Sequence, residues 1–154
     1  MTVVVHTGGC QCRHIRYQIS TDPIVAYCCH CTDCQQQSSS AFGISVWFAQ
    51  PSFKLTNGRL SFWKTKADSG NEKSCAYCKL CGTRIYHAFT DQQDILSVKG
   101  GSLDNRSGIN PAGHIWTRSA LSWMRDSLVE STSYDTEPED FEVLIRLFRY
   151  SHNQ

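Results

Sequence analysis

The segment that decides the fold is Tyr77-Cys78-Lys79-Leu80-Cys81-Gly82-Thr83, a CxxC pair followed directly by glycine. A tetrahedral zinc ion takes sulfur ligands at about 2.3 Å, so two of them must come from one tight turn. Gly82 suits such a turn because glycine adopts positive φ without a steric penalty. The segment therefore predicts one half of a metal site, and the other half must come from elsewhere in the chain.

The other half is expected from the CxC pair near the N-terminus, Cys10-Gln11-Cys12. Together with Cys78 and Cys81 it makes a closed set of four sulfurs, the usual composition of a structural zinc site. Such a site would join two segments more than sixty residues apart, with a binding free energy of about 10–16 kcal/mol in model peptides. Spacing alone also permits Cys75 in place of Cys81, but Gly82 favours the Cys78–Cys81 turn.

A second group with ligand spacing has three members only: Cys29, Cys31 and Cys34. Three thiolates leave one tetrahedral position open, which is typical of a catalytic zinc ion. A closed structural site, with Cys28, Cys75 or a histidine as fourth ligand, is the alternative. His30 has predicted ligands on both sides and is expected to point away from the metal. Three soft ligands favour a sulfur in the open position, so the group points toward a thiol substrate held as thiolate.

The composition narrows the class of protein. The chain has 154 residues, 40% of them hydrophobic, and a net charge of +1, as expected of one globular domain and not of a strongly basic protein that binds nucleic acid. Its nine cysteines are odd in number, so disulfides cannot pair them all. The N-terminus has no signal-peptide pattern, and the longest mostly apolar stretch, residues 41–49, is too short to span a membrane. We therefore expect a cytoplasmic protein with reduced thiols, no nucleic-acid partner and no membrane partner.

Period-two patterns predict a mainly β fold. The predicted strands include Ile15 to Ile19, Ile44 to Phe48, Leu60 to Phe62, a strand around Ile85, and Ile95 to Val98. Gly8-Gly9 is expected to form a turn, and Asn57-Gly58 a hairpin between residues 53–55 and 60–62. Thr32 to Ser39 is expected to hold a short helical turn. A C-terminal helix is predicted through Phe141 to Phe148, with Thr136 and Glu139 as a capping box and Pro138 in the first turn.

Several motifs in order resemble the glutathione-dependent formaldehyde-activating enzyme family, which also includes centromere protein V. The motifs are Gly8-Gly9-Cys10-Gln11-Cys12 with Tyr17, Cys29-His30-Cys31-Thr32-Asp33-Cys34, Ser38-Ser39-Ser40-Ala41-Phe42, Tyr77 to Thr83, Gly101-Ser102-Leu103-Asp104-Asn105, and His114-Ile115-Trp116 with Trp123. Four positions depart from the family pattern: Arg13 and Ser39 stand where the family has glycine, Tyr77 replaces Phe, and Asn105 replaces Asp. None of these four positions belongs to the two cysteine groups.

The resemblance implies a single domain over residues 1–154, a β-tent of small antiparallel sheets joined by structural zinc. It implies two zinc ions per chain, a structural one on Cys10, Cys12, Cys78 and Cys81 and a catalytic one on Cys29, Cys31 and Cys34. The implied activity is that of a carbon–sulfur lyase, the reversible addition of glutathione or a similar thiol to formaldehyde or another small aldehyde. His30 or His114 is available for the proton.

A second function stays open at the level of sequence, a zinc-stabilised binding module without catalysis on the same scaffold.

Under the enzymatic hypothesis, four basic residues are candidate partners for the carboxylates of glutathione, although solvated surface charges are the simpler interpretation: Arg59, Lys64, Lys66 and Arg118.

Overall fold

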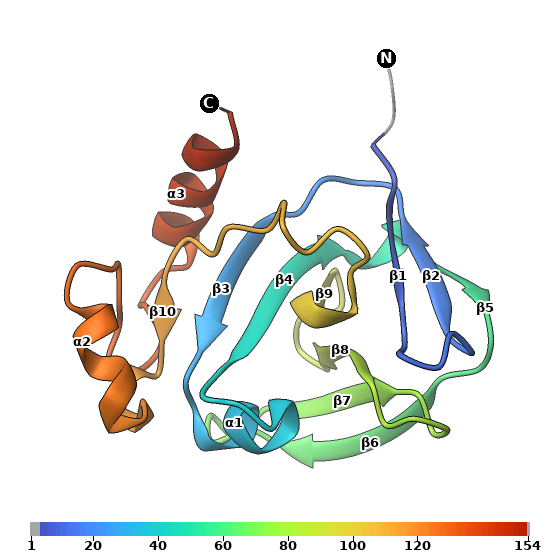
Figure 1. The fold of residues 1–154 in the computed structure, drawn as a ribbon, viewed down its shortest axis with the longest axis horizontal. Coiled ribbons are helices and arrows are strands. Elements are labelled where there is room, and N and C mark those ends of the chain that lie inside the picture. Colours follow the sequence, from blue (N-terminus) through green and yellow to red (C-terminus); the bar gives the residue numbers. More distant parts are fainter. Residues whose placement is uncertain (1–3, 154) are drawn as a thin grey trace. The chain divides into compact units, whose positions relative to one another are not determined.

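The computed structural model describes residues 4–153 and is mainly β, with a helix at the C-terminal end (Figure 1). The strands are β1 (His6–Gly9), β2 (Arg16–Ile19), β3 (Val25–Cys29), β4 (Gly43–Ala49), β5 (Phe53–Asn57), β6 (Ser61–Lys66), β7 (Glu72–Tyr77), β8 (Arg84–Phe89), β9 (Ile95–Lys99) and β10 (His114–Ile115). The α-helices are α1 (Thr32–Ser38), α2 (Arg125–Leu128) and α3 (Glu142–His152). Four 3₁₀ turns complete the order: η1 (Gln50–Ser52), η2 (Gly100–Ser102), η3 (Thr117–Ser119) and η4 (Ser122–Met124). The predicted mainly β class and C-terminal helix are confirmed.

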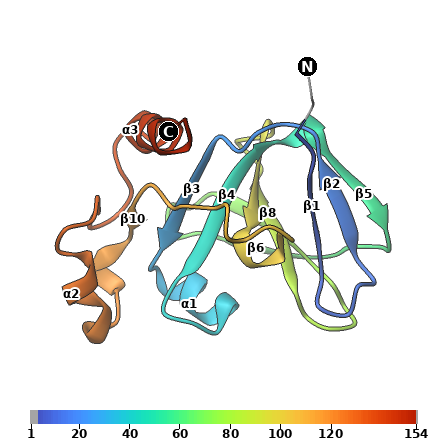
Figure 2. The ribbon, with the colours of Figure 1, turned by 45° about the horizontal axis from the view of Figure 1, so that its top comes forward.

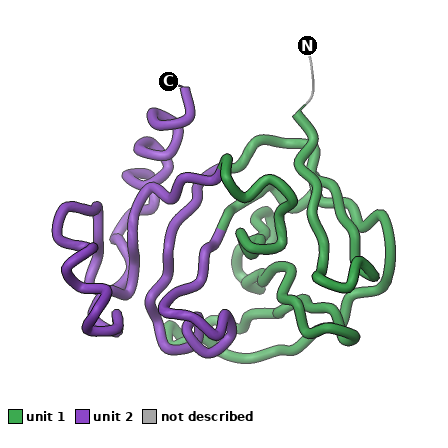
Figure 3. The backbone as a smooth tube through the Cα atoms, viewed as in Figure 1, with its two compact units in different colours: residues 1–23, 46–108 green, residues 24–45, 109–154 purple. Residues whose placement is uncertain are grey.

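The chain packs as two compact units (Figure 3). Unit 1 comprises the residues up to 23 together with 46–108, and unit 2 comprises 24–45 together with 109–154. The boundary between residues 45 and 46 falls inside β4. The single-domain organisation stays a prediction. None of the helices among residues 4–153 has the length and apolar character needed to cross a bilayer.

Unit 1 contains an antiparallel three-stranded sheet in the order β1-β2-β5. Ile15, Tyr17 and Ile19 are completely or almost completely buried, so the predicted alternation of β2 is confirmed. The turn predicted at Gly8-Gly9 is wrong, because both glycines lie in β1 opposite Tyr17 and Arg16. A side chain at Gly8 would collide with the Tyr17 ring, so the glycine serves close packing instead of a turn.

The hairpin predicted at Asn57-Gly58 is also wrong. β5 pairs with β2, whereas β6 pairs with β7, so the two strands flanking Asn57-Gly58 belong to different sheets. Gly58 has φ +83° and lies so close to the carbonyl of His14 that a Cβ would collide with it. The Asn57 amide donates to that same carbonyl at 2.9 Å. The dipeptide thus has the expected turn chemistry but directs the chain from one sheet to the next.

Strands β9, β8, β7 and β6 of unit 1 lie next to one another in that order, and their pairs are antiparallel. The predicted strands around Ile85 and from Ile95 to Val98 correspond to β8 and β9. β6 is at the edge and leaves Phe62 and Trp63 about half exposed, with 54% and 51% of their surface accessible. The alternation of Leu60 and Phe62 with polar residues therefore located the strand, but it did not indicate how much of the strand is exposed to solvent.

In unit 2, β10 runs parallel to β3, and α3 packs against β3, as Figure 2 shows with α3 viewed almost along its axis. All five residues of β3 are buried, and this continuous burial gives no alternating pattern in the sequence. The Tyr27 ring contacts that of Phe141 at 5.5 Å between centroids. Leu144 and Phe148 are the buried residues of α3, as its spacing predicts.

The predicted start of the C-terminal helix is wrong. α3 begins at Glu142, so Thr136, Pro138 and Glu139 precede it instead of forming its cap and first turn. The N-cap position is Phe141, and the side chain of Asp140, four residues after Thr136, accepts from the backbone N–H of Glu142 at 2.9 Å. Local spacing alone could not distinguish between these two capping possibilities.

The two positions at which this chain departs from a family glycine both have positive φ, +65° at Arg13 and +50° at Ser39. The left-handed conformation costs a residue with a Cβ about 1 kcal/mol relative to glycine. We therefore expect Arg13→Gly and Ser39→Gly each to raise the free energy of unfolding by about 0.5–1 kcal/mol. Thermal unfolding monitored by circular dichroism measures the change in the free energy of unfolding. The matched control is Gln36→Gly inside α1, which should lower stability; an equal loss from Ser39→Gly would contradict the prediction.

Candidate functional site: two cysteine groups

Cys10, Cys12, Cys78 and Cys81 come together in unit 1, with their sulfur atoms all within 4.8 Å of one another. The Cys78–Cys81 segment is a tight turn in which Gly82 donates to the Cys78 carbonyl at 2.8 Å and has φ +76°. On the other side, Cys10 follows β1, and its backbone N–H donates to the carbonyl of Ile15. The four predicted ligands are therefore brought together from two distant turns.

The geometry of this group fits a tetrahedral metal ion. Four sulfurs at about 2.3 Å from one zinc ion are separated by roughly 3.8 Å. The Cys10 and Cys12 sulfurs are 3.5 Å apart, and those of Cys12 and Cys78 are 3.8 Å apart. The backbone N–H of Ile15 donates to the Cys10 sulfur at 3.1 Å, an outer contact that favours a thiolate. Cys75 is buried in β7 and lies outside the group.

Thr83 supports the Cys81 thiol of this group. Its hydroxyl lies 3.2 Å from the Cys81 sulfur, and hydrogen bonds from its side chain and backbone lower the pKa of Cys81 to about 5. Metal binding requires deprotonated sulfur, so a thiol of this pKa is already prepared as a ligand at neutral pH.

Cys29, Cys31 and Cys34 form the second group, in unit 2, and their sulfurs also lie within 4.8 Å of one another. Cys29 ends β3, Cys31 is the N-cap of α1, and Cys34 lies in its first turn. The Cys34 backbone N–H donates to the Cys31 sulfur at 3.3 Å. Hydrogen bonding with Cys31 and Cys34, together with burial, raises the pKa of Cys29 above its ordinary value, as expected when three thiols share one small volume. Among the described residues, no fourth cysteine, histidine or carboxylate belongs to this group.

Gly43 and Cys28 are the neighbours of this group on the adjacent strands. Gly43 at the start of β4 lies against Cys34, where a Cβ would be 3.4 Å from the Cys34 Cβ and 3.7 Å from its sulfur. Cys28 is buried on β3 and does not belong to the group. Either cysteine group could thus hold a metal ion, one through four sulfurs and the other through three.

His30 is fully buried and does not belong to the ligand group, although it lies between Cys29 and Cys31 in the sequence. Its Nε2 is 3.0 Å from Nδ1 of His114, and its ring contacts that of Phe42 at 5.2 Å between centroids. Burial lowers the pKa of both histidines, so both are neutral at pH 7. The Gln35 side-chain amide donates to the carbonyls of His30 and Ser119, each at 2.8 Å, and holds the segment in place.

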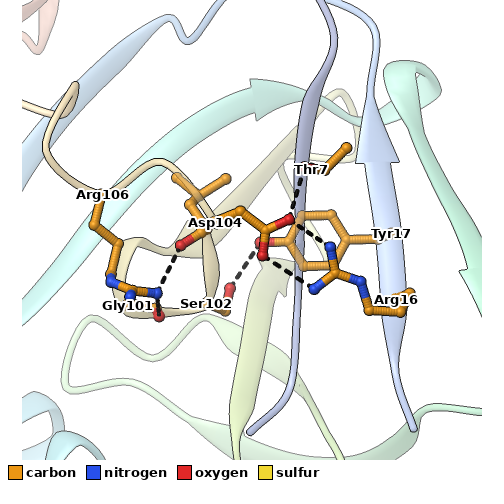
Figure 4. Close-up of polar contacts among 8 residues, drawn as sticks. Thr7, Arg16, Tyr17, Gly101, Ser102, Asp104 and Arg106 are labelled. Carbon is orange, nitrogen blue, oxygen red and sulfur yellow. Dashed lines mark hydrogen bonds and ion pairs between the residues drawn. The ribbon is translucent and has the colours of Figure 1, made fainter. Parts of the chain in front are cut away.

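The Gly101–Asn105 motif has a structural role in unit 1 (Figure 4). Asp104 accepts hydrogen bonds from both terminal nitrogens of Arg16, and from the Thr7 hydroxyl at 2.7 Å. The hydroxyl groups of Tyr17 and Ser102 are 2.8 Å apart. These contacts join β1 and β2 to the turn after β9, next to the turn that carries Cys10.

The Arg16–Asp104 pair predicts an acid-dependent contribution to stability. Hydrogen bonds from Arg16 lower the pKa of Asp104 from 3.8 to about 2. The contribution is therefore fully present above pH 4 and is lost as the pH falls through about 2. Because both side chains are more than a third exposed, we expect less than about 1 kcal/mol. Urea unfolding at pH 5 and pH 2.5 should show a smaller acid-induced loss in Asp104→Asn than in the parent, and an equal loss would contradict this.

The sequence drew attention to Arg59, Lys64, Lys66 and Arg118 as basic candidates, and a second group of basic side chains was not considered. The structure instead buries Lys73 and His87 in neighbouring strands, near Arg84 and Lys99. The available signal was the pair of polar residues at alternate positions of β9, Ser97 and Lys99, but β7 itself was not predicted.

Comparisons with known proteins concern the family and the fold. Residues 5–119 match the sequence model of the family described as glutathione-dependent formaldehyde-activating enzyme. A crystal structure of a Rhodobacter sphaeroides protein shares the fold with a TM-score of 0.54 and 16% identity, covering 83% of this chain and 99% of its own. No curated protein sequence matches the chain. The matched region includes every cysteine of both groups, and this chain belongs to the glutathione-dependent formaldehyde-activating enzyme family.

Proposed function

We propose that this protein is a zinc-dependent carbon–sulfur lyase-type enzyme that reversibly adds a thiol of the glutathione type to formaldehyde or another small aldehyde. The observation that carries the proposal is the group of three sulfurs from Cys29, Cys31 and Cys34, without a fourth ligand among the described residues. Family membership supports thiol–aldehyde chemistry. The open position is the place where a substrate thiol would enter.

The two cysteine groups are assigned different roles because one supplies four sulfur ligands to a metal ion and the other supplies three. Four sulfurs from two distant turns satisfy a tetrahedral ion, so Cys10, Cys12, Cys78 and Cys81 are proposed to hold a structural zinc ion. Cys29, Cys31 and Cys34 are proposed to hold the catalytic one. The protein would then bind two zinc ions per chain, of which one is accessible to substrate.

When bound, a zinc ion held by three thiolates lowers the pKa of a thiol in its fourth position and thereby supplies a nucleophile at neutral pH. The sulfur–carbon bond forms as the carbonyl π bond breaks, and the thiol proton ends on the former carbonyl oxygen. No atom is oxidised or reduced overall. The role of Cys29, Cys31 and Cys34 is to fix the position of the ion relative to the substrate.

The His30–His114 pair is proposed to handle the proton. Both rings are neutral at pH 7 because burial lowers their pKa values, so a ring nitrogen is available to accept a proton. The 3.0 Å contact between them, with Phe42 against His30, fixes the rings. A fixed neutral imidazole is suited to general base and acid catalysis near neutral pH.

The test is exchange NMR on mixtures of glutathione and formaldehyde. Purified protein with two zinc ions per chain should accelerate their interconversion with S-hydroxymethylglutathione beyond the uncatalysed rate. Protein stripped of the more labile zinc ion is the control and should lose the acceleration. Fully loaded protein that leaves the exchange rate unchanged would refute the formaldehyde reaction.

A further inference from the structure

One face of strands β7, β8 and β9 in unit 1 gathers basic side chains. Paired residues of an antiparallel sheet point to the same face, and alternate residues of a strand share it. His87 of β8 pairs with Cys75 of β7 and with Ser97 of β9. Lys73, two residues from Cys75, and Lys99, two residues from Ser97, therefore lie on the same face as His87.

A β-bulge adds Arg84 to this face. In a regular strand, Arg84 and His87 are three residues apart and would point in opposite directions. The register shifts between Ala76 and Tyr77, so that Arg84 pairs with Tyr77 while Tyr86 pairs with Ala76, and one residue of β8 is left over. Tyr77 shares the face of Cys75, and so does its partner Arg84. Bulges often redirect a side chain in this way at functional sites.

The face contains buried hydrogen-bond donors that no residue between 4 and 153 satisfies. Nε and Nη2 of Arg84 are buried and have no partner among the described residues, and the same holds for the buried hydroxyl of Ser97. Nε–H and one Nη2–H point from the same edge of the guanidinium, the edge that takes a carboxylate or phosphate through two parallel hydrogen bonds. Buried polar groups are seldom left without partners, so these donors are available to a ligand.

The electrostatics of the face favour an anion. Lys99 Nζ lies 2.7 Å from Nδ1 of His87. Burial and the nearby charges of Lys99, Lys73 and Arg84 lower the pKa of His87 well below its ordinary value, so the imidazole is neutral and adds no further positive charge. Lys73 and Lys99 make other contacts as well, which leaves Arg84 and Ser97 as the donors open to a ligand.

We propose that this face, defined by Lys73, Arg84, His87, Ser97 and Lys99, is a binding site for a small oxyanion that places two oxygens on the Nε/Nη2 edge of Arg84. The ligand is a carboxylate or a phosphate group carried by a small molecule. The site uses none of the metal-ligand cysteines, so it goes beyond the proposed function and does not depend on it.

The test titrates zinc-loaded protein with two probes, S-methylglutathione, which has two carboxylates and no free thiol, and inorganic phosphate. Binding is followed through the Arg84 Nε–H resonance by NMR and through isothermal titration calorimetry. We expect at least one probe to shift that resonance and saturate. Binding of S-methylglutathione but not of phosphate would identify the ligand as a carboxylate, and binding of phosphate but not of S-methylglutathione would identify it as a phosphate.

Arg84→Gln should weaken binding of the active probe at least about tenfold, and Ser97→Ala should weaken it by a smaller factor. Lys66→Gln, on the exposed surface of β6, is the matched charge control and should bind as the parent does. Arg84→Gln should also keep its melting temperature, because the buried Nε and Nη2 donors that it removes have no partner among the described residues. If the variant does not fold, Ser97→Ala provides the test. The proposal is overturned if neither probe shifts the resonance at millimolar concentration, or if the folded variants bind as tightly as Lys66→Gln.

Discussion

Cys78→Ala is expected to bind no zinc at the four-cysteine group and to lose the cooperative unfolding transition of the protein. Cys78 is fully buried, and its sulfur lies 3.8 Å from that of Cys12 on the other turn of the group. Structural zinc contributes about 10–16 kcal/mol in small model domains, whereas a whole domain is stable by only about 5–15 kcal/mol. Losing one ligand of four therefore removes enough free energy to unfold unit 1. Zinc content by mass spectrometry and thermal melting by circular dichroism measure the two effects.

The matched control for this variant is Cys75→Ala, three residues earlier in β7, the strand that leads into the turn of Cys78. Cys75 is equally buried but lies outside the ligand group, so its loss should cost only about 1–2 kcal/mol and leave the zinc content unchanged. A Cys78→Ala variant with the parent's zinc content and the melting temperature of Cys75→Ala would contradict the structural role of the group.

Cys31→Ser is expected to lose one zinc ion and catalysis while the protein stays folded. Cys31 is the N-cap of α1, and its sulfur accepts from the backbone N–H of Cys34. Serine is a preferred N-cap residue whose hydroxyl accepts the same hydrogen bond, so the helix start should be preserved. The unfolding free energy should then change by less than about 1 kcal/mol, whereas the rate of thiol–aldehyde exchange should fall by more than about a hundredfold.

Cys28→Ala provides the control for the second group, because Cys28 is buried next to Cys29 but contributes no sulfur to it. It should keep two zinc ions and the activity of the parent. If Cys31→Ser unfolds as Cys78→Ala does, the three-cysteine group is structural and the proposed catalysis is wrong. The comparison of Cys31→Ser with Cys78→Ala thus distinguishes a catalytic ion from a structural one by two independent measurements, the melting temperature and the exchange rate.

The arrangement of the cysteines was predictable because metal ligands that share a turn are a local property of the chain. CxxC followed by glycine requires positive φ at the residue after the second cysteine, and Gly82 has it. The short helical turn predicted for the polar segment Thr32 to Ser39, after the cysteines, likewise corresponds to α1. Strands with one buried face, such as β2 with Tyr17 and Ile19, were predictable for the same reason, because the alternation of apolar and polar residues extends over only a few neighbouring positions.

Strand pairing was not predictable in this way. Asn57-Gly58 has the chemistry of a hairpin turn, yet β5 and β6 pair with β2 and β7, because the choice of partner depends on distant segments. β3 was missed since all its residues are buried and none of them alternates with a polar residue.

The sequence by itself determined which sulfurs can share a metal ion, since their spacing and the glycine after them restrict the chain to tight turns. It also determined the family, through ordered motifs that extend over most of the matched region. Only the tertiary structure decided that Arg84 shares a face with His87, because a bulge defined by pairing with β7 reverses the direction of that side chain. It alone decided as well that the Gly101–Asn105 motif joins Asp104 to Arg16, residues 88 positions apart, since such a contact exists only when distant strands have paired.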